Sequence, residues 1–293
     1  MRFLERSSDG TNRLWKYVLV CVCALVVWPA VGSAPLAVVT LIRSYMPGGG
    51  GELSNNVMLS LILFSTVVAL VLTVWLVKVL HGRSFSEVVN GRKKVRVGRC
   101  LTGAGLWLAL MSAVYVADFL LNRGDYVVRF DLGRFIPLIF ISLVLIPFQA
   151  AGEEYLFRGY MAQGFAAWTG RRWVAWVAPS FVFGLMHVFN PEVGEYGFWA
   201  MMPQYIYCGL FFGLTAILDD GIELAVGLHA ANNIFLSLFV TSESSVLQTD
   251  AVLEVVNIDP LKDTLLLVLM SVVAASLLAV RYKWNFSLLL KRL

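Results

Sequence analysis

Charged residues interrupt an apolar region at Gln149–Gly164, which reads QAAGEEYLFRGYMAQG and follows the uncharged run Phe135–Phe148. Ionisable side chains at membrane depth are costly and usually functional. On a helix, Glu154 and Arg158 lie four residues apart and meet on one face, whereas Glu153 points about 100° away. We therefore predict an ion pair between Glu154 and Arg158, which leaves the carboxylate of Glu153 free for chemistry.

Two of the three histidines lie in apolar segments with a motif partner four residues away. His187 follows Phe183 in FGLMH, and His229 precedes Asn233 in HAANN. Residues four apart share a helix face, so His229 and Asn233 present to the same side. A single histidine in an apolar helix is more often a hydrogen-bonded core residue than a catalytic group. Two of them, with a glutamate pair elsewhere, favour one shared site, because intramembrane ionisable groups usually face each other or a wet cavity.

These residue types suit the hydrolysis of an amide. A carboxylate serves as a general base toward water, and an imidazole shares that water or protonates the leaving amine. A second imidazole and an amide NH₂ donate hydrogen bonds to the developing oxyanion. The alternative is a zinc site with His187, His229 and Glu153 as ligands, since two imidazoles and a carboxylate are a common catalytic zinc set. The chain has neither an HExxH motif nor a serine in a GxSxG turn.

The composition is that of a polytopic membrane protein. Of 293 residues, 59% are hydrophobic and 14% charged, whereas soluble domains are about 45–50% apolar and about 25% charged. Apolar runs near the roughly 20 residues needed to cross a bilayer predict an all-α bundle of about eight transmembrane helices. The expected spans are Tyr17–Ile42, Val57–Leu80, Leu101–Leu121, a fourth from about Phe135, Trp173–Phe189, Gln204–Leu218, Ile222–Val240 and Thr264–Val280, the sixth and seventh being short.

The distribution of basic residues predicts the orientation. Most of them lie in the N-terminal segment, the loop His81–Arg99, the Arg171–Arg172 turn and the C-terminal tail. Under the positive-inside rule this pattern places both termini in the cytoplasm. The basic run in the loop His81–Arg99 is most simply a topology signal and a contact with anionic lipid, so we expect no nucleic acid as a partner. The chain lacks an organelle import presequence, which favours a multi-pass protein of the cell membrane.

Three ordered motifs carry a resemblance to a known family. EEYLFR, FGLMH and HAANN resemble the EExxxR, FxxxH and HxxxN motifs of the CPBP family of intramembrane proteases, the CAAX prenyl endopeptidase and bacteriocin-processing group. The resemblance covers about Ile136–Val240. It suggests three regions: a three-span N-terminal part (1–134), a protease core (135–240), and an outer loop with the last helix (241–293).

The resemblance also implies roles for the motif residues. Glu153 and His187 would activate water, and His229 and Asn233 would form the oxyanion site. The ion pair predicted above would be a structural support. These four polar groups suffice to activate water without a metal, so we expect no cofactor and keep zinc as the alternative.

The function expected on this basis is cleavage of a membrane-associated peptide or protein, of the CAAX type or of the bacteriocin and pheromone type. One rival keeps the fold without the activity, as a membrane scaffold or immunity protein. Another is a transporter or proton relay, which predicts polar groups in several spans and a symmetric repeat. Neither feature is found in the sequence.

Overall fold

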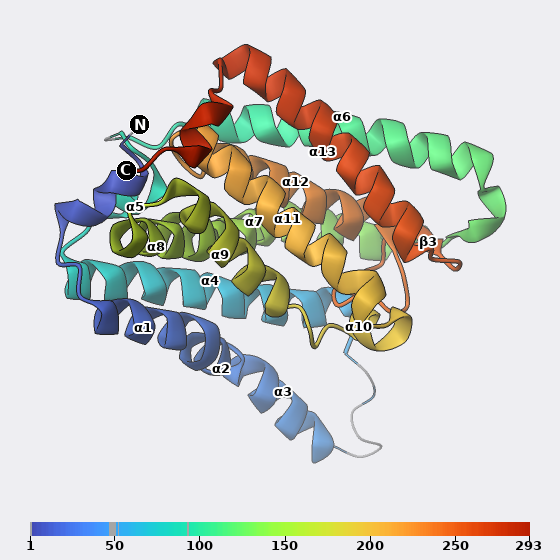
Figure 1. The fold of residues 1–293 in the computed structure, drawn as a ribbon. Coiled ribbons are helices and arrows are strands. Elements are labelled where there is room, and N and C mark those ends of the chain that lie inside the picture. The colour runs from blue at the N-terminus through green and yellow to red at the C-terminus, as the bar shows by residue number, and fades with distance from the viewer. Residues whose placement is uncertain (1, 47–50, 52, 93) are drawn as a thin grey trace.

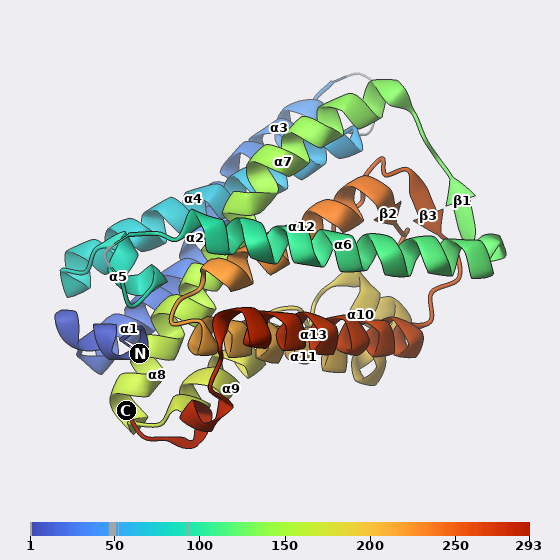
Figure 2. The same cartoon turned by 90° about the horizontal axis from the view of Figure 1, so that it is seen from above.

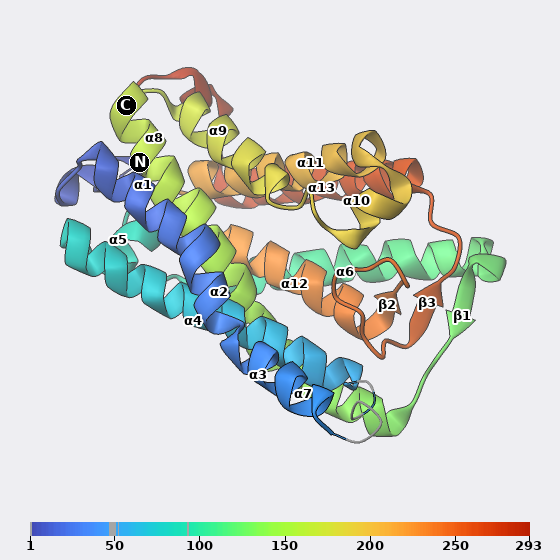
Figure 3. The ribbon, with the colours of Figure 1, turned by 90° about the horizontal axis from the view of Figure 1, so that it is seen from below.

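The computed structural model describes residues 2–46, 51, 53–92 and 94–293, and these form a bundle of helices (Figure 1). Both termini lie at one end of the bundle (Figures 1 and 3). A small sheet and the short helix α10 (Pro191–Tyr196) lie at the opposite end. The site described below lies between these two ends.

Within the described residues, six helical stretches are long and apolar enough to cross a membrane. The first, Leu14–Ser44, joins α1 (Leu14–Val22), a π-helical turn (Cys23–Val27), α2 (Trp28–Gly32) and α3 (Ala34–Ser44). The predicted all-α, multi-pass membrane architecture is confirmed. The other five stretches are α4 (Asn55–His81), α6 (Val97–Leu121), Leu132–Thr169, α11 (Phe198–Leu218) and α13 (Pro260–Tyr282).

The lengths of the remaining expected spans differ from the prediction. Helix α11 has 21 residues and begins before Gln204, because it continues through Pro203. The fifth segment forms α9 (Arg172–Leu185), which has only 14 residues, and the seventh forms α12 (Glu223–Phe239), which has 17. Both are shorter than the roughly 20 residues of a spanning helix, so the count of eight spans stays a prediction.

Helix α12 is the central element, since it packs against α6, α7, α11 and strand β2 and most of its side chains are buried. Small residues allow its close approach to α6 (Figure 2). A Cβ atom at Gly227 would lie 2.0 Å from the carbonyl oxygen of Cys100, and one at Gly103 would lie 2.6 Å from that of Leu224. Small residues serve this purpose widely at helix interfaces in membranes. This packing also sets the position of His229, which follows Gly227 by two residues.

The motif helix is continuous over Leu132–Thr169. It consists of α7 (Leu132–Glu154), a π-helical segment (Tyr155–Met161) and α8 (Ala162–Thr169). The helix continues through Pro137 and Pro147, and the π-helical segment begins directly after Glu154. Such π-helical turns occur frequently at functional sites.

A three-stranded sheet lies at the end of the bundle opposite to the termini (Figure 2). Its strands are β1 (Tyr126–Val128), β2 (Val240–Thr241) and β3 (Leu253–Val255). The central strand β3 pairs antiparallel with β1 and parallel with β2. Because β2 directly follows α12, the sheet connects the C-terminal end of that helix to the loops around it.

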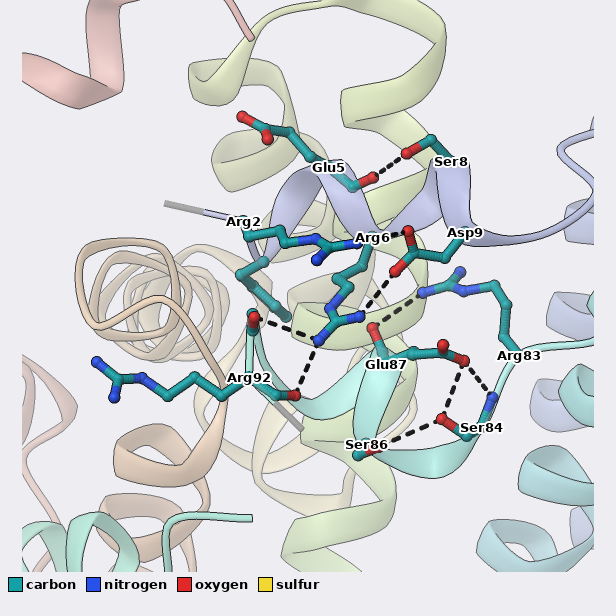
Figure 4. A network of polar contacts seen from close by, with 12 residues as sticks. Arg2, Glu5, Arg6, Ser8, Asp9, Arg83, Ser84, Ser86, Glu87 and Arg92 are labelled. Atoms are coloured by element: carbon teal, nitrogen blue, oxygen red, sulfur yellow. Dashed lines mark hydrogen bonds and ion pairs between the residues drawn. The ribbon is translucent and has the colours of Figure 1, made fainter. Parts of the chain in front are cut away.

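At the end of the bundle that carries the termini, the first residues of the chain are bonded to the loop between α4 and α6 (Figure 4). The 3₁₀ turn Leu4–Asp9 carries Arg6, whose guanidinium donates to Asp9 at 2.8 Å and to the carbonyl oxygens of Gly91 and Arg92 at 3.2 and 3.0 Å. In the same loop, α5 (Phe85–Val89) begins with a capping box formed by Ser84 and Glu87. These contacts hold the N-terminal segment against the loop between α4 and α6.

The turn that leads into α12 is held by a buried charge cluster. Arg96 forms ion pairs with Asp219, at 3.1 Å, and with Glu223 in the first turn of α12. Arg99 also reaches Asp219, at 3.3 Å. Burial nevertheless raises the pKa of Asp219 to about 6, because desolvation outweighs the two guanidinium groups. The amide N–H of Phe3 donates to the neighbouring Asp220 at 2.9 Å, which links this turn to the N-terminus.

Candidate functional site

The motif helix directs its two glutamates to different partners. The side chain of Glu154 is fully buried, and its Oε1 accepts a hydrogen bond from Nη1 of Arg158 at 2.8 Å. Glu153 is about 30% exposed, and its Oε1 accepts a hydrogen bond from the amide of Gln149, one turn earlier. The predicted ion pair is therefore present, and the predicted division between a paired and an unpaired carboxylate is present as well.

Glu154 has a second partner that the spacing of the motif does not reveal. Its Oε1 also lies 2.8 Å from Nδ1 of His229 on α12. A carboxylate can only accept hydrogen bonds, so Nδ1 carries a proton and donates it. Glu154 thus fixes the ring orientation of His229 and directs the opposite nitrogen, Nε2, toward Glu153.

The free oxygen of Glu153 lies in this same space. Its Oε2 is 3.7 Å from Nε2 of His229. That oxygen is buried and has no hydrogen-bond partner among the described residues. Polar atoms at such a separation are commonly bridged by water. The arrangement leaves one carboxylate oxygen and one imidazole nitrogen available to a single small molecule.

His187 lies just beyond the end of α9 rather than within it, because the helix stops at Leu185. Its Nδ1 is 2.9 Å from the carbonyl oxygen of Phe183, which can only accept, so Nδ1 is protonated. The Nε2 atom of the neutral ring is then free to accept a hydrogen bond. The imidazole stacks on Tyr205 of α11, with ring centroids 4.5 Å apart, and this contact fixes its plane.

Aromatic rings surround the polar groups. The ring of Phe183 has its centroid 4.1 Å from the guanidinium carbon of Arg158 and 4.7 Å from the centroid of His187. Phe212 stacks on His229 at 5.0 Å between centroids. A cation over an aromatic face is stabilised by the ring quadrupole. The phenylalanine of the FxxxH motif therefore packs between the buried arginine and the imidazoles.

Asn233 completes the set through Gln149. Its Nδ2 donates to Oε1 of Gln149 at 3.0 Å, and the amide of Gln149 in turn donates to Glu153. One of the two amide protons of Asn233 is used in this bond, and the second is available to another acceptor. The adjacent Asn232 accepts a hydrogen bond from Trp107 of α6 at 3.2 Å.

These groups line one cavity of about 610 Å³. Its wall includes the four predicted catalytic residues and two that the sequence did not single out, Gln149 and Tyr205. Gln149 had a sequence signal, since it is an amide four residues before Glu153 in an apolar run. Tyr205 had none. Glu153 and His187 share the cavity without a direct hydrogen bond between them in the part of the chain that the structure describes.

The alternative zinc ligands do not form a metal site. Among the described residues, no three His, Cys, Asp or Glu side chains are grouped so that they could hold a metal ion. The Nδ1–H groups of His187 and His229 donate to a carbonyl oxygen and to Glu154, which leaves both Nε2 atoms free. Because metal-ligating histidines are held in the same way, these bonds do not decide between the two readings, and catalysis without a metal stays a prediction.

Comparison with known proteins agrees with the motifs. The sequence profile of the type II CAAX prenyl endopeptidase Rce1-like family matches residues 135–235. The chain is 30% identical over 253 residues to the uncharacterized protein YyaK of Bacillus subtilis (strain 168), and the match covers 84% of each chain. No solved structure matches the chain. The chain therefore belongs to the CPBP family of intramembrane proteases, as a type II CAAX prenyl endopeptidase-like member.

Proposed function

We propose that this protein is a glutamic intramembrane endopeptidase of the cell membrane that hydrolyses a peptide bond of a membrane-associated peptide or protein. The observation that carries the proposal is the buried Oε2 of Glu153, which has no hydrogen-bond partner among the described residues and faces Nε2 of His229. The Oε2 atom of Glu154 also has no partner among the described residues, but Glu154 is engaged by Arg158 and His229 and does not line the cavity, whereas Glu153 does. An unpaired buried oxygen on the cavity wall is available to a water molecule or a substrate.

In the proposed reaction, a water molecule next to Glu153 loses a proton to that carboxylate and attacks the peptide carbonyl carbon. The free Nε2 of His187 accepts a hydrogen bond from the same water and orients it. The proton taken by Glu153 then passes to the leaving amine as the C–N bond breaks. General base catalysis of this kind typically contributes on the order of 10²–10⁴ in rate.

The oxyanion that forms in this step would be stabilised by donors on α12. Asn233 has one amide proton that is not used by Gln149, and His229 donates through Nε2 when both ring nitrogens are protonated. Glu154 and Arg158 act as positioning residues, because Glu154 holds His229 and Arg158 holds Glu154, and neither touches the reacting atoms.

The experiment that tests this function compares wild type with Glu153→Gln, both purified as full chains in detergent, on fluorogenic peptides with and without a prenylated C-terminal cysteine. Mass spectrometry identifies the products. We expect wild type to release defined fragments and the variant to release none. Equal behaviour of the two proteins, together with equal effects of the two alleles on membrane peptides in cells, would instead indicate a non-catalytic scaffold.

A further inference from the structure

The cavity extends well beyond the proposed catalytic groups. From His187 its wall continues to Tyr205, whose hydroxyl accepts a hydrogen bond from Asn190 at 3.1 Å. Asn190 directly precedes helix α10, which carries Glu192 on the cavity wall. The wall then includes the first turn of α13 and strand β1, at the end of the bundle opposite to the termini (Figures 1 and 2).

The charges on this wall have one predominant sign. Among the described residues, the Asp, Glu, Lys and Arg side chains that line the cavity are one ammonium group and six carboxylates, although the chain as a whole has a net charge of +4. Clefts lined by one sign of charge with low-dielectric walls focus the electric field and concentrate ligands of opposite charge. The ammonium group is Lys262, and the carboxylates are Asp118, Asp125, Glu153, Glu192, Asp259 and Asp263.

Of these carboxylates, Asp118 alone forms an ion pair with a Lys or Arg side chain among the described residues, and the charge of the same lysine also acts on Asp263. Lys262 pairs with Asp118 at 2.6 Å. Glu192 accepts a hydrogen bond from the amide of Val246 through Oε1, while its Oε2 is buried without a hydrogen-bond partner among the described residues. Asp263, on the first turn of α13, has no side-chain hydrogen bond or ion pair with any described residue. The outer wall of the cavity, formed by α10, the first turn of α13 and the segments next to β1, therefore carries more carboxylates than cations beside the proposed active site.

The spacing of these carboxylates argues against a single metal ion as their partner. No group of three or more potential ligands converges on one point among the described residues. The carboxylates come instead from α6, α7, α10, α13 and the segments that lead into β1 and α13. Charges distributed along a cavity suit a ligand whose own cations are distributed along a chain.

Resting on the function proposed above, we propose that this acidic wall, with Glu192 and Asp263 as its specificity-determining residues, binds a basic segment of the substrate beside the scissile bond. The substrate class is a peptide with lysine or arginine residues flanking an apolar cleavage region. The apolar part lies against the aromatic and aliphatic wall around Glu153, while the basic part lies against the outer wall. This segment enters from the end of the bundle that carries α10 and the sheet.

Binding to the full chain with Glu153→Gln tests this inference independently of catalysis. Three fluorescent peptides share one apolar segment and differ only in a flanking triplet of Lys, Gln or Glu, and their dissociation constants are measured by anisotropy in an uncharged detergent. We expect the Lys peptide to bind tighter than the Glu peptide by roughly tenfold, with the difference shrinking as salt is added, as for partly exposed ion pairs.

A matched pair of double variants, made in the same Glu153→Gln background, locates the effect. Glu192→Gln with Asp263→Asn removes the wall charges, and we expect it to reduce the preference for Lys over Glu to roughly twofold. Glu195→Gln with Glu243→Gln removes the same charge from nearby side chains that do not line the cavity, and we expect the preference to remain. Melting temperatures confirm that all three proteins are folded.

The outcomes separate this inference from the proposed function. Equal binding of the three peptides, or an equal loss of preference in the control variant, would overturn the acidic-wall assignment. Cleavage by wild type without any charge preference would overturn the inference and leave the proposed function in place. Lys-selective binding without cleavage of the same peptides by wild type would overturn the proposed function and leave the acidic-wall assignment in place.

Discussion

Replacing Glu154 by Gln tests the buried centre of the site most severely. Its Oε1 receives hydrogen bonds from both Arg158 and His229 at 2.8 Å, and the side chains of Glu154 and Arg158 are 0% and 1% exposed. Glutamine keeps the shape but removes the charge, so the guanidinium is left buried without its counter-ion. Removal of one partner from a buried pair typically costs about 3–5 kcal/mol. With about 2–4 °C lost per kcal/mol in a large domain, the melting temperature should fall by roughly 10 °C.

The assay for this prediction is thermal unfolding in detergent, followed beside peptide cleavage. Glu153→Gln is the matched control, since Glu153 is partly exposed and its one hydrogen bond among the described residues comes from Gln149. We expect the control to melt close to wild type while losing activity. A second variant adds Arg158→Met to Glu154→Gln, which removes both charges together.

That second variant separates stability from positioning. Replacing a buried ion pair by well-packed neutral side chains is often neutral or stabilising, so the double variant should regain most of the lost melting temperature. Its activity should stay low, because His229 has lost the charged acceptor that orients its ring. If Glu154→Gln alone melts within about 2 °C of wild type, the buried pair is not the support described here.

Three other changes test the surrounding structure. Asn233→Ala should lower kcat by a factor on the order of 10²–10³ in peptide cleavage with little change in KM, as for an oxyanion donor, whereas a raised KM with kcat unchanged would point to a binding role. Because the pKa of Asp219 is raised, the native protein binds a proton at this carboxyl at a higher pH than the unfolded chain does, so its contribution to stability increases as pH falls from about 7 to about 4. Melting curves of Asp219→Asn should lack this part of the pH dependence. An unchanged pH dependence would refute the raised pKa. In a cysteine-free background, Ser244→Cys in whole cells should react with a membrane-impermeant maleimide and Ser8→Cys should not, and the opposite pattern would reverse the predicted orientation.

The part of the site that follows from helix geometry could be predicted from the sequence. The spacing of EExxxR within one helix is enough to pair Glu154 with Arg158 and to turn Glu153 away from them. The same geometry pairs Gln149 with Glu153, one turn earlier, and this contact was available to the same reasoning. Local periodicity is a reliable signal because it depends on one element only.

Contacts between helices were beyond the reach of that reasoning. The hydrogen bond from His229 to Glu154 joins α12 to α7, and the stack of His187 on Tyr205 joins α9 to α11. Both depend on how closely the helices approach, which small residues such as Gly227 determine in three dimensions. The sequence therefore indicated one shared polar site, and the structure adds that Glu154 orients an imidazole as well as pairing with the arginine.

The end of the protein that carries the sheet differed most from expectation. Its strands have only two or three residues each, which is too short for a periodic signal. Helix α12 needs no full span of apolar residues, since it is enclosed by other helices rather than by lipid. The acidic wall of the cavity combines residues from α6 to α13 that are distant in sequence, so no local pattern could assemble it.

The central claim is that Glu153 activates water without a metal. The most direct measurement is peptide cleavage by purified wild type and Glu153→Gln, each with and without a strong chelator. We expect wild-type cleavage to survive the chelator and the variant to lose activity by at least roughly 10²-fold, as expected for loss of a general base. Loss of wild-type activity on chelation, restored by zinc, would contradict this account and make His187 and His229 metal ligands.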